Sequence, residues 1–178
     1  MSDWASGYTT EVNYVRSYHP HINPLRMRLA LLNAGLAFPT IGTACELGFG
    51  WGLGPTFHAS TSETQWHGTD VNPTQAKFAQ DLAALTETNS VLRDDSFDEF
   101  AKRSDLPDFD YIVLHGIWSW ISDQNRAVIV DFVRRKLKTG GVVYISYNTL
   151  PGRALFQPVQ HLLAEHVSAP PGACRCGY

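Results

Sequence analysis

Two acidic residues flank a run of glycines in a pattern that could hold a nucleoside. Glu46 opens the stretch Glu-Leu-Gly-Phe-Gly-Trp-Gly at 46–52, and Asp70 closes the next apolar run. A strand that turns directly into a helix needs glycine for backbone freedom, and a ligand approaches the main chain most closely where no Cβ intrudes. A second acid that ends the next apolar run completes a layout suited to holding a nucleoside ligand at the edge of a parallel sheet. The segment therefore predicts a small-molecule cofactor site.

The spacing of the glycines separates two classes of nucleoside ligand. In the dinucleotide pattern G-x-G-x-x-G, the sixth place holds glycine, but here Leu53 occupies it. The carboxylate of Glu46 would also repel a pyrophosphate at the helix N-terminus, whereas it would attract an ammonium or sulfonium group. The pattern favours a positively charged nucleoside over a nicotinamide dinucleotide.

Residues 46–52 resemble the first motif of the class I S-adenosylmethionine-dependent methyltransferases, (D/E)-x-G-x-G-x-G. The resemblance implies that S-adenosyl-L-methionine is the cofactor and that the chain is a methyltransferase. By the same resemblance, Glu46, Gly48, Gly50 and Gly52 line the methionine half of the cofactor. Asp70 would then take both ribose hydroxyls.

Three further stretches resemble a bacterial subgroup that includes some protein lysine methyltransferases, in which a regulatory domain follows the methyltransferase domain. They are Tyr-Thr-Thr-Glu-Val-Asn-Tyr at 8–14, His-Gly-Ile-Trp-Ser-Trp-Ile at 115–121 and Tyr-Asn-Thr-Leu-Pro-Gly at 147–152. The likeness runs from about Tyr8 to about Val167. It implies methyl transfer to a protein lysine or to a small molecule.

Apolar runs alternate with helical patterns along the chain, which predicts an α/β fold. Strands are expected over 43–47, 66–70, 90–93, 111–115 and 142–147, and helices over 24–34, 54–60, 73–85, 97–102, 124–137 and 153–167. We expect a Rossmann-like, doubly wound, mainly parallel sheet of five strands with helices on both faces. The expected division is an N-terminal arm or lid over 1–22, a cofactor-binding domain over 23–167 and an irregular tail over 168–178.

Ligands of such sheets bind at the carboxyl ends of the strands, which adds candidates to the cofactor site. The resemblance implies that the turn after the third strand holds the adenine. Asp95 and Ser96 fit that role best, with Asp94 left open because the register is fixed only to within a residue. Tyr14, in the N-terminal arm, and His115, at the end of the fourth strand, complete the candidate cofactor contacts.

The candidates on the acceptor side are Tyr147 and Asn148, after the fifth strand. In direct displacement, a nucleophile attacks the methyl carbon of the sulfonium, so the protein mainly aligns the reactants and excludes water. A lysine acceptor must first lose its proton, which an apolar channel favours. Large aromatic residues are usually buried for packing, and this is the interpretation preferred for Trp120.

The end of the chain departs from the family pattern, in which two more strands form a final hairpin. Pro170 and Pro171 break regular structure, and no alternation of apolar residues follows Val167. The tail therefore resembles a truncation. A bare sheet edge would invite pairing with a second copy of the chain. The alternative function is a non-catalytic remnant that binds S-adenosylmethionine or S-adenosylhomocysteine.

Composition predicts a domain with a real core. The 178 residues are 44% hydrophobic and 17% charged, with a formal net charge of −3. No apolar run is long enough for a membrane span, and the N-terminus has no secretion signal, so a cytoplasmic location is expected. The scattered basic residues argue against a nucleic-acid surface. The three cysteines predict neither a disulfide framework nor a metal site.

Overall fold

The structure is a computed structural model that describes residues 15–149, 151–152, 154–156, 158–159 and 161–162. The chain divides into two compact units, 1–147 and 148–178. The first unit contains the sheet. In the second, the 3-10 helix η3 (Ala154–Phe156) is described, and the helix expected over 153–167 lies largely outside the described residues.

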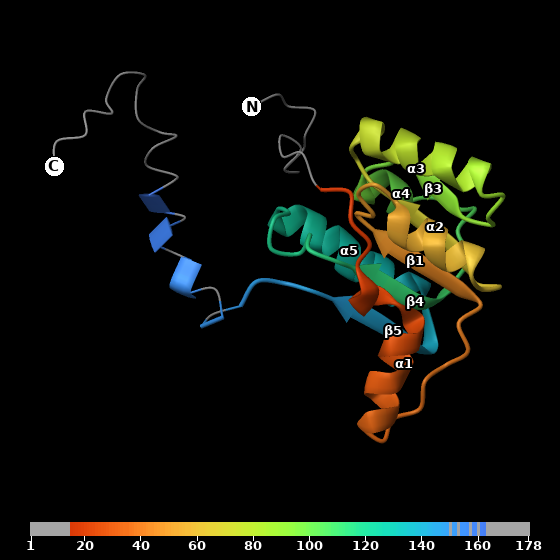
Figure 1. Cartoon of the computed structure of the whole chain (residues 1–178), viewed down its shortest axis with the longest axis horizontal. Helices are drawn as coiled ribbons and strands as arrows, with labels where there is room; N and C mark the ends of the chain where they lie inside the picture. Colours follow the sequence, from red (N-terminus) through yellow and green to blue (C-terminus); the bar gives the residue numbers. More distant parts are fainter. Residues whose placement is uncertain (1–14, 150, 153, 157, 160, 163–178) are drawn as a thin grey trace, which may run out of the picture. The chain divides into compact units, whose positions relative to one another are not determined.

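Five parallel strands form one sheet in the order β3-β2-β1-β4-β5, which confirms the predicted fold class (Figure 1). The strands are β1 (Thr43–Leu47), β2 (Gln65–Thr69), β3 (Val91–Arg93), β4 (Phe109–Leu114) and β5 (Leu137–Ile145). The direction of winding reverses between β1 and β4. In open α/β sheets, this reversal places a ligand crevice at the carboxyl ends of these strands.

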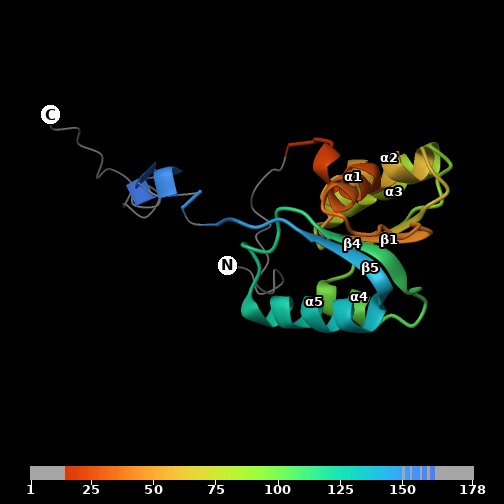
Figure 2. The same ribbon diagram turned by 90° about the horizontal axis from the view of Figure 1, so that it is seen from below.

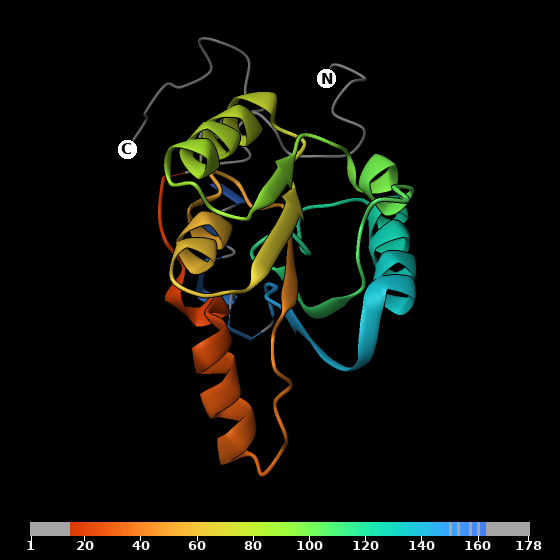
Figure 3. The same cartoon turned by 90° about the vertical axis from the view of Figure 1, so that its right-hand side faces the viewer.

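Helices cover both faces of the sheet, as a parallel sheet requires (Figures 2 and 3). One face carries α1 (Pro24–Asn33), α2 (Leu53–Ser60) and α3 (Pro73–Leu85), and the other carries α4 (Phe97–Ala101) and α5 (Asp123–Lys136). A short 3-10 helix, η2 (Pro20–Ile22), precedes α1. Every strand-to-helix turn therefore opens at one edge of the sheet.

The side chains of β1 alternate between the two faces and join different cores. Cys45 and Leu47 pack with the apolar residues of α4 and α5, whereas Ala44 packs with Ile22 and Trp66 on the opposite face. Glu46 has the same parity as Ala44, so its carboxyl group lies on the face of Ile22 and α2. A buried strand thus carries one acid into an otherwise apolar layer.

Helix starts follow the predicted signals. Asn23 caps α1 by accepting from the Leu25 N–H at 2.8 Å, and Asn72 caps α3 by accepting from the N–H groups of Thr74 and Gln75. A proline follows each cap at the first helical position. The cap at Asn72 leaves Asp70 free for another role, as the sequence suggested.

Two elements differ from the sequence-based expectation. β5 begins at Leu137 rather than at residue 142, because Leu137 already pairs with Phe109 of β4 and the register then shifts, with extra residues in β5 before Val142 pairs with Tyr111. The leucines expected to form the apolar face of α1 are not core residues: Leu25 and Leu29 are 71% and 70% exposed, whereas Met27 packs against the core. The spacing of apolar residues located this helix correctly but did not predict which of its residues pack against the core.

Among the described residues, no helix is long and apolar enough to cross a membrane.

Asp110 of β4 fastens the start of β1 to the sheet. Its Oδ2 accepts hydrogen bonds from the N–H groups of Gly42 and Thr43, each at 2.9 Å, and from Lys138 at 3.1 Å. Burial acts to raise the pKa of Asp110, but these hydrogen bonds outweigh it and hold the pKa below its usual value.

Replacing Asp110 with Asn should therefore lower the free energy of unfolding by about 1–3 kcal/mol at pH 7, measured by urea denaturation. The pKa of Asp110 is depressed by folding, so its stabilisation is present above its unfolded pKa and is lost as pH falls through the folded value. The difference between the two proteins should shrink below about pH 4. Asp131→Asn, which removes an exposed pair with Arg135, is the control and should change stability by less than about 0.5 kcal/mol. Equal losses in both variants would contradict this role.

Candidate functional site

A cavity of about 450 Å³ lies where the turns after β1, β2 and β4 meet. This volume is within the roughly 300–1,000 Å³ of small-molecule sites. The segment that precedes α1 forms part of the wall through Val15, Ser17, His19 and Ile22. The predicted residues on the wall are Glu46, Gly48, Gly50, Asp70 and His115. Five of the nine cofactor-side candidates are thus brought together around one cavity.

The three glycines of the turn after β1 have left-handed backbone conformations, and two of them leave no room for a Cβ. Gly48 has φ +74°, and a Cβ there would lie 2.8 Å from Cγ2 of Ile117. Gly52, with φ +67°, caps α2, and a Cβ there would overlap Ala79 of α3. Gly52 is not on the cavity wall but holds α2 close to α3. The main chain can therefore approach a ligand closely at this turn.

Asp70 connects the ends of β1 and β2. Its carboxylate accepts hydrogen bonds from the Gly50 N–H at 2.7 Å and the Asn72 N–H at 2.9 Å. Burial raises the pKa of Asp70 to about 6, although both hydrogen bonds act to lower it. A carboxylate has about four acceptor positions, so these two bonds leave capacity for a ligand hydroxyl.

Glu46 is buried without a full set of partners. It is 4% exposed, and its Oε2 has no hydrogen-bond partner among the described residues. Burial, together with the neighbouring charge of Asp70, raises the pKa of Glu46 to about 8. Gly54 makes room for this carboxyl group, since a Cβ there would lie 3.0 Å from Oε2. An unpaired buried carboxyl is costly, so this position suits a ligand that brings a donor or a positive charge.

The turn after β4 contributes an apolar wall and one histidine. Ile117, Trp120 and Ile121 line the cavity together with His115. Burial, together with the neighbouring His19 and His21, lowers the pKa of His115 to about 4. The packing role preferred for Trp120 is wrong: Trp120 is 50% exposed on the cavity wall, and Trp118 is the one that packs against the core.

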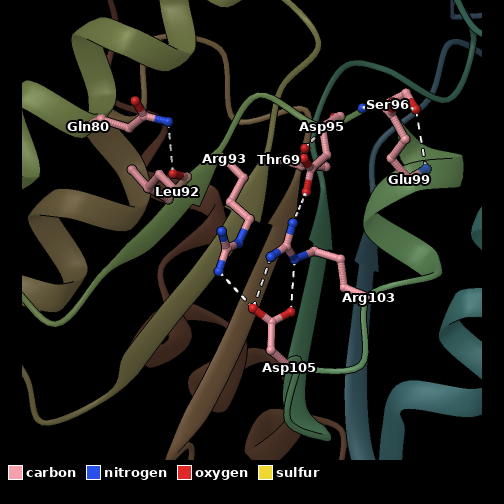
Figure 4. A network of polar contacts seen from close by, with 9 residues as sticks. All are labelled: Thr69, Gln80, Leu92, Arg93, Asp95, Ser96, Glu99, Arg103 and Asp105. Atoms are coloured by element: carbon pink, nitrogen blue, oxygen red, sulfur yellow. Dashed lines mark hydrogen bonds and ion pairs between the residues drawn. The ribbon is translucent and has the colours of Figure 1, made fainter.

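The predicted adenine residues do not line the cavity and make other contacts (Figure 4). Ser96 caps α4: its hydroxyl accepts from the Glu99 N–H, while its own N–H donates to Glu99 Oε2 at 2.9 Å. The Asp95 carboxylate pairs with Arg103 at 3.1 Å, and its carbonyl accepts from the Thr69 hydroxyl. The neighbouring Phe97 does line the cavity, so the predicted turn reaches the site through a different residue.

Three candidates remain: Tyr14, Tyr147 and Asn148. Tyr14 is outside the described residues. Tyr147 is 60% exposed and is not on the cavity wall, and Asn148 belongs to the second unit. Their roles stay predictions.

The sequence predicted an arm or lid over 1–22 but named only Tyr14 as a contact there, so it missed the residues of this segment that line the cavity. Its position depends on contacts with distant residues: the Tyr111 hydroxyl donates to the Ile22 carbonyl at 3.1 Å, and the ring of Tyr18 lies 4.9 Å from that of Phe57. In the sequence, the two histidines His19 and His21, two residues apart just before a helix, could have indicated that this segment contributes to the site.

The buried Glu46 should make the protein less stable as pH rises. Its pKa is raised by folding, so the folded chain keeps a proton that the unfolded chain releases, and stability falls between about pH 4.5 and pH 8. We expect Glu46→Gln to raise the free energy of unfolding by about 1–3 kcal/mol at pH 8 and to change it little below pH 4. Urea denaturation across this range measures both values, with the exposed Glu63→Gln as control. A Glu46→Gln variant that is less stable than the parent at pH 8 would contradict this electrostatic description.

Comparisons with known proteins place this geometry in context. No family model matches the chain. An uncharacterized protein of Synechocystis, sll1526, is 44% identical over 168 residues, which covers 92% of this chain and 33% of that protein. The structure of PKMT2 from Rickettsia typhi in complex with AdoHcy matches with a TM-score of 0.78 at 23% identity, covering 93% of this chain and 32% of that one.

A second solved structure is similar over most of its own length. A SAM-dependent methyltransferase from Geobacter sulfurreducens in complex with S-adenosyl-L-homocysteine matches with a TM-score of 0.54 at 16% identity, covering 94% of this chain and 70% of that one. The chain spans about a third of the length of the Synechocystis and Rickettsia typhi proteins. With a sheet in the order β3-β2-β1-β4-β5 and a glycine turn after β1, the chain has the fold of the class I S-adenosylmethionine-dependent methyltransferases.

Proposed function

We propose that the cavity binds S-adenosyl-L-methionine and that the chain carries the cofactor-binding half of a methyltransferase site. The observation that carries the proposal is the carboxyl group of Glu46, buried on the cavity wall with Oε2 unpartnered among the described residues. A ligand with an ammonium and a sulfonium group would supply the missing partner charge. The AdoHcy and S-adenosyl-L-homocysteine complexes of the structural neighbours support this choice.

The residues on the wall fit the parts of such a ligand. Glu46 would hold the charged methionine end, and its ionised form would become favourable once the cation is bound. The bare backbone at Gly48 and Gly50 would lie against the ligand. Asp70 would accept from the ribose hydroxyls while its bonds to Gly50 and Asn72 keep the carboxylate in position.

The proposed reaction requires little acid–base catalysis by the protein. The bound sulfonium supplies an activated methyl group, so the protein has to orient the acceptor and exclude water. Ile117, Ile121 and the half-exposed Trp120 form an apolar wall that could serve both needs. An aromatic face could also stabilise positive charge near the reacting centre.

For the acceptor we propose a lysine side chain of a protein, with Tyr147 and Asn148 on the acceptor side. The three stretches shared with the bacterial subgroup support this choice. An apolar approach would favour the neutral amine, which is the form that attacks the methyl carbon.

Transfer of a labelled methyl group from S-adenosylmethionine into a cell lysate tests the enzymatic proposal. Label in acid-stable protein bonds, absent with an Asp70→Asn variant, would support a protein methyltransferase. Label in small molecules would support methyltransferase activity but would show that the acceptor is a small molecule and not a protein lysine. Saturable binding without transfer to any fraction would instead support a cofactor-binding remnant.

Ligand-dependent melting tests the binding site itself. At about 100 times its dissociation constant, S-adenosylhomocysteine should stabilise the protein by about 2.7 kcal/mol, which raises the melting midpoint by roughly 5–10 °C. Asp70→Asn should lose most of this shift relative to its own ligand-free midpoint, whereas the exposed Asp131→Asn should keep it. NAD should produce no shift. A full shift in Asp70→Asn, or a larger response to NAD, would contradict the assignment.

Binding of the positively charged donor should also depend on pH. Because the pKa values of Asp70 and Glu46 are raised to about 6 and about 8, raising the pH from 6 to 8 ionises the pair and should strengthen binding of S-adenosylmethionine. Calorimetry should show a smaller increase in Glu46→Gln than in the parent chain, and the parental increase in the control Glu63→Gln. An equal increase in all three proteins would assign the pH dependence to Asp70 or to the ligand and not to Glu46.

A further inference from the structure

Three histidines that are far apart in the sequence lie close together at the edge of the cavity. His19 and His21 belong to the segment that enters α1, and His115 follows β4. One ligand atom from each ring lies within 4.8 Å of those of the other two. Nε2 of His21 is 3.2 Å from Nε2 of His115, and the ring centre of His19 is 4.4 Å from that of His115. His19 and His115 line the cavity.

We propose that His19, His21 and His115 bind a divalent transition-metal ion, with Zn²⁺ as the first expectation. Imidazole nitrogen is a preferred ligand of zinc, copper and nickel, and zinc takes three histidines in one common arrangement. With metal–nitrogen bonds of about 2.0–2.1 Å, two nitrogens of a tetrahedral site lie about 3.3 Å apart. The 3.2 Å between His21 and His115 fits this spacing.

The surroundings of His115 can supply the required tautomer. Its Nδ1 is 3.0 Å from the Ser146 hydroxyl oxygen, which also accepts from the Gly116 N–H at 2.7 Å. This oxygen can accept a hydrogen bond from Nδ1–H of His115, which leaves the Nε2 lone pair for the ion.

A plain hydrogen bond between His21 and His115 explains one contact but not the approach of the third ring. Nε2 of His19 lies 3.3 Å from the Ser17 hydroxyl, which can donate to it, but this contact does not draw His19 to the other two rings, whereas a cation would bind all three. Three protein ligands leave a further coordination position for water or for a donor atom of a ligand. The inference revises the expectation from sequence that the chain holds no metal, and it does not depend on the proposed cofactor.

Metal binding should be measured on the full chain without an affinity tag, after treatment with a chelator. The probes are Zn²⁺, in competition with a chromophoric chelator, and Co²⁺, which in a four-coordinate site absorbs visible light. We expect one ion per chain. His21→Ala and His115→Ala should each weaken binding by more than about 100-fold, and Ser146→Ala by about 10-fold. The control His161→Ala removes a histidine of the second unit and should leave affinity unchanged.

A variant's loss of affinity is interpreted only if, without metal, the variant unfolds at the same urea concentration as the parent chain. If the variants fail to fold, spectroscopy of the parent chain still tests the proposal. X-ray absorption of the zinc-loaded protein should show nitrogen ligands at about 2.0–2.1 Å. Sulfur ligands at about 2.3 Å, which would indicate cysteines such as Cys174 and Cys176, would overturn the proposal. So would the absence of binding, or binding that survives in both folded histidine variants.

Discussion

The site depends on one constraint, which is the burial of two carboxyl groups beside a glycine turn. Glu46 and Asp70 end neighbouring parallel strands, and the Gly50 N–H connects the turn to Asp70. Both groups have raised pKa values because they are withdrawn from water, and Glu46 lacks a full set of partners. A fold that only needed a tight turn would gain stability from an uncharged residue at position 46. The unfavourable burial of a carboxyl group without a full set of partners therefore indicates a ligand that compensates for it.

The rest of the first unit can be understood as the support for this arrangement. The parallel order of the strands brings the turns after β1, β2 and β4 to one edge, and the two cores on opposite faces hold that edge in place. Asp110 fastens the start of β1 at the opposite end of the sheet. Gly52 and Gly54 allow α2 to approach α3 and Glu46 closely. Small residues around the acid thus allow its burial.

The sequence predicted those parts of the site that depend on local rules. Parallel strands end at one edge, so the convergence of Glu46, Asp70 and His115 followed from their positions at strand ends. The roles of Asp95 and Ser96 could not be predicted in the same way, because an acid or a serine before a helix can also form an ion pair or cap the helix. In the structure, Asp95 pairs with Arg103 and Ser96 caps α4. The path of residues 15–22 was not predictable, since it depends on the contact of Ile22 with Tyr111. The approach of His21 to His115, 94 residues apart, has the same origin.

The ionisation state of Glu46 tests the central claim most directly. In protein labelled with carbon-13 at the glutamate carboxyl, NMR titration reports the pKa of this group, and Glu46→Gln assigns its signal. We predict that Glu46 is mainly protonated at pH 7 in the free chain, because burial and Asp70 raise its pKa to about 8. Addition of S-adenosylmethionine at the same pH should ionise it. A Glu46 signal that titrates near the usual pKa of glutamate, or that does not change when the ligand is added, would contradict the account.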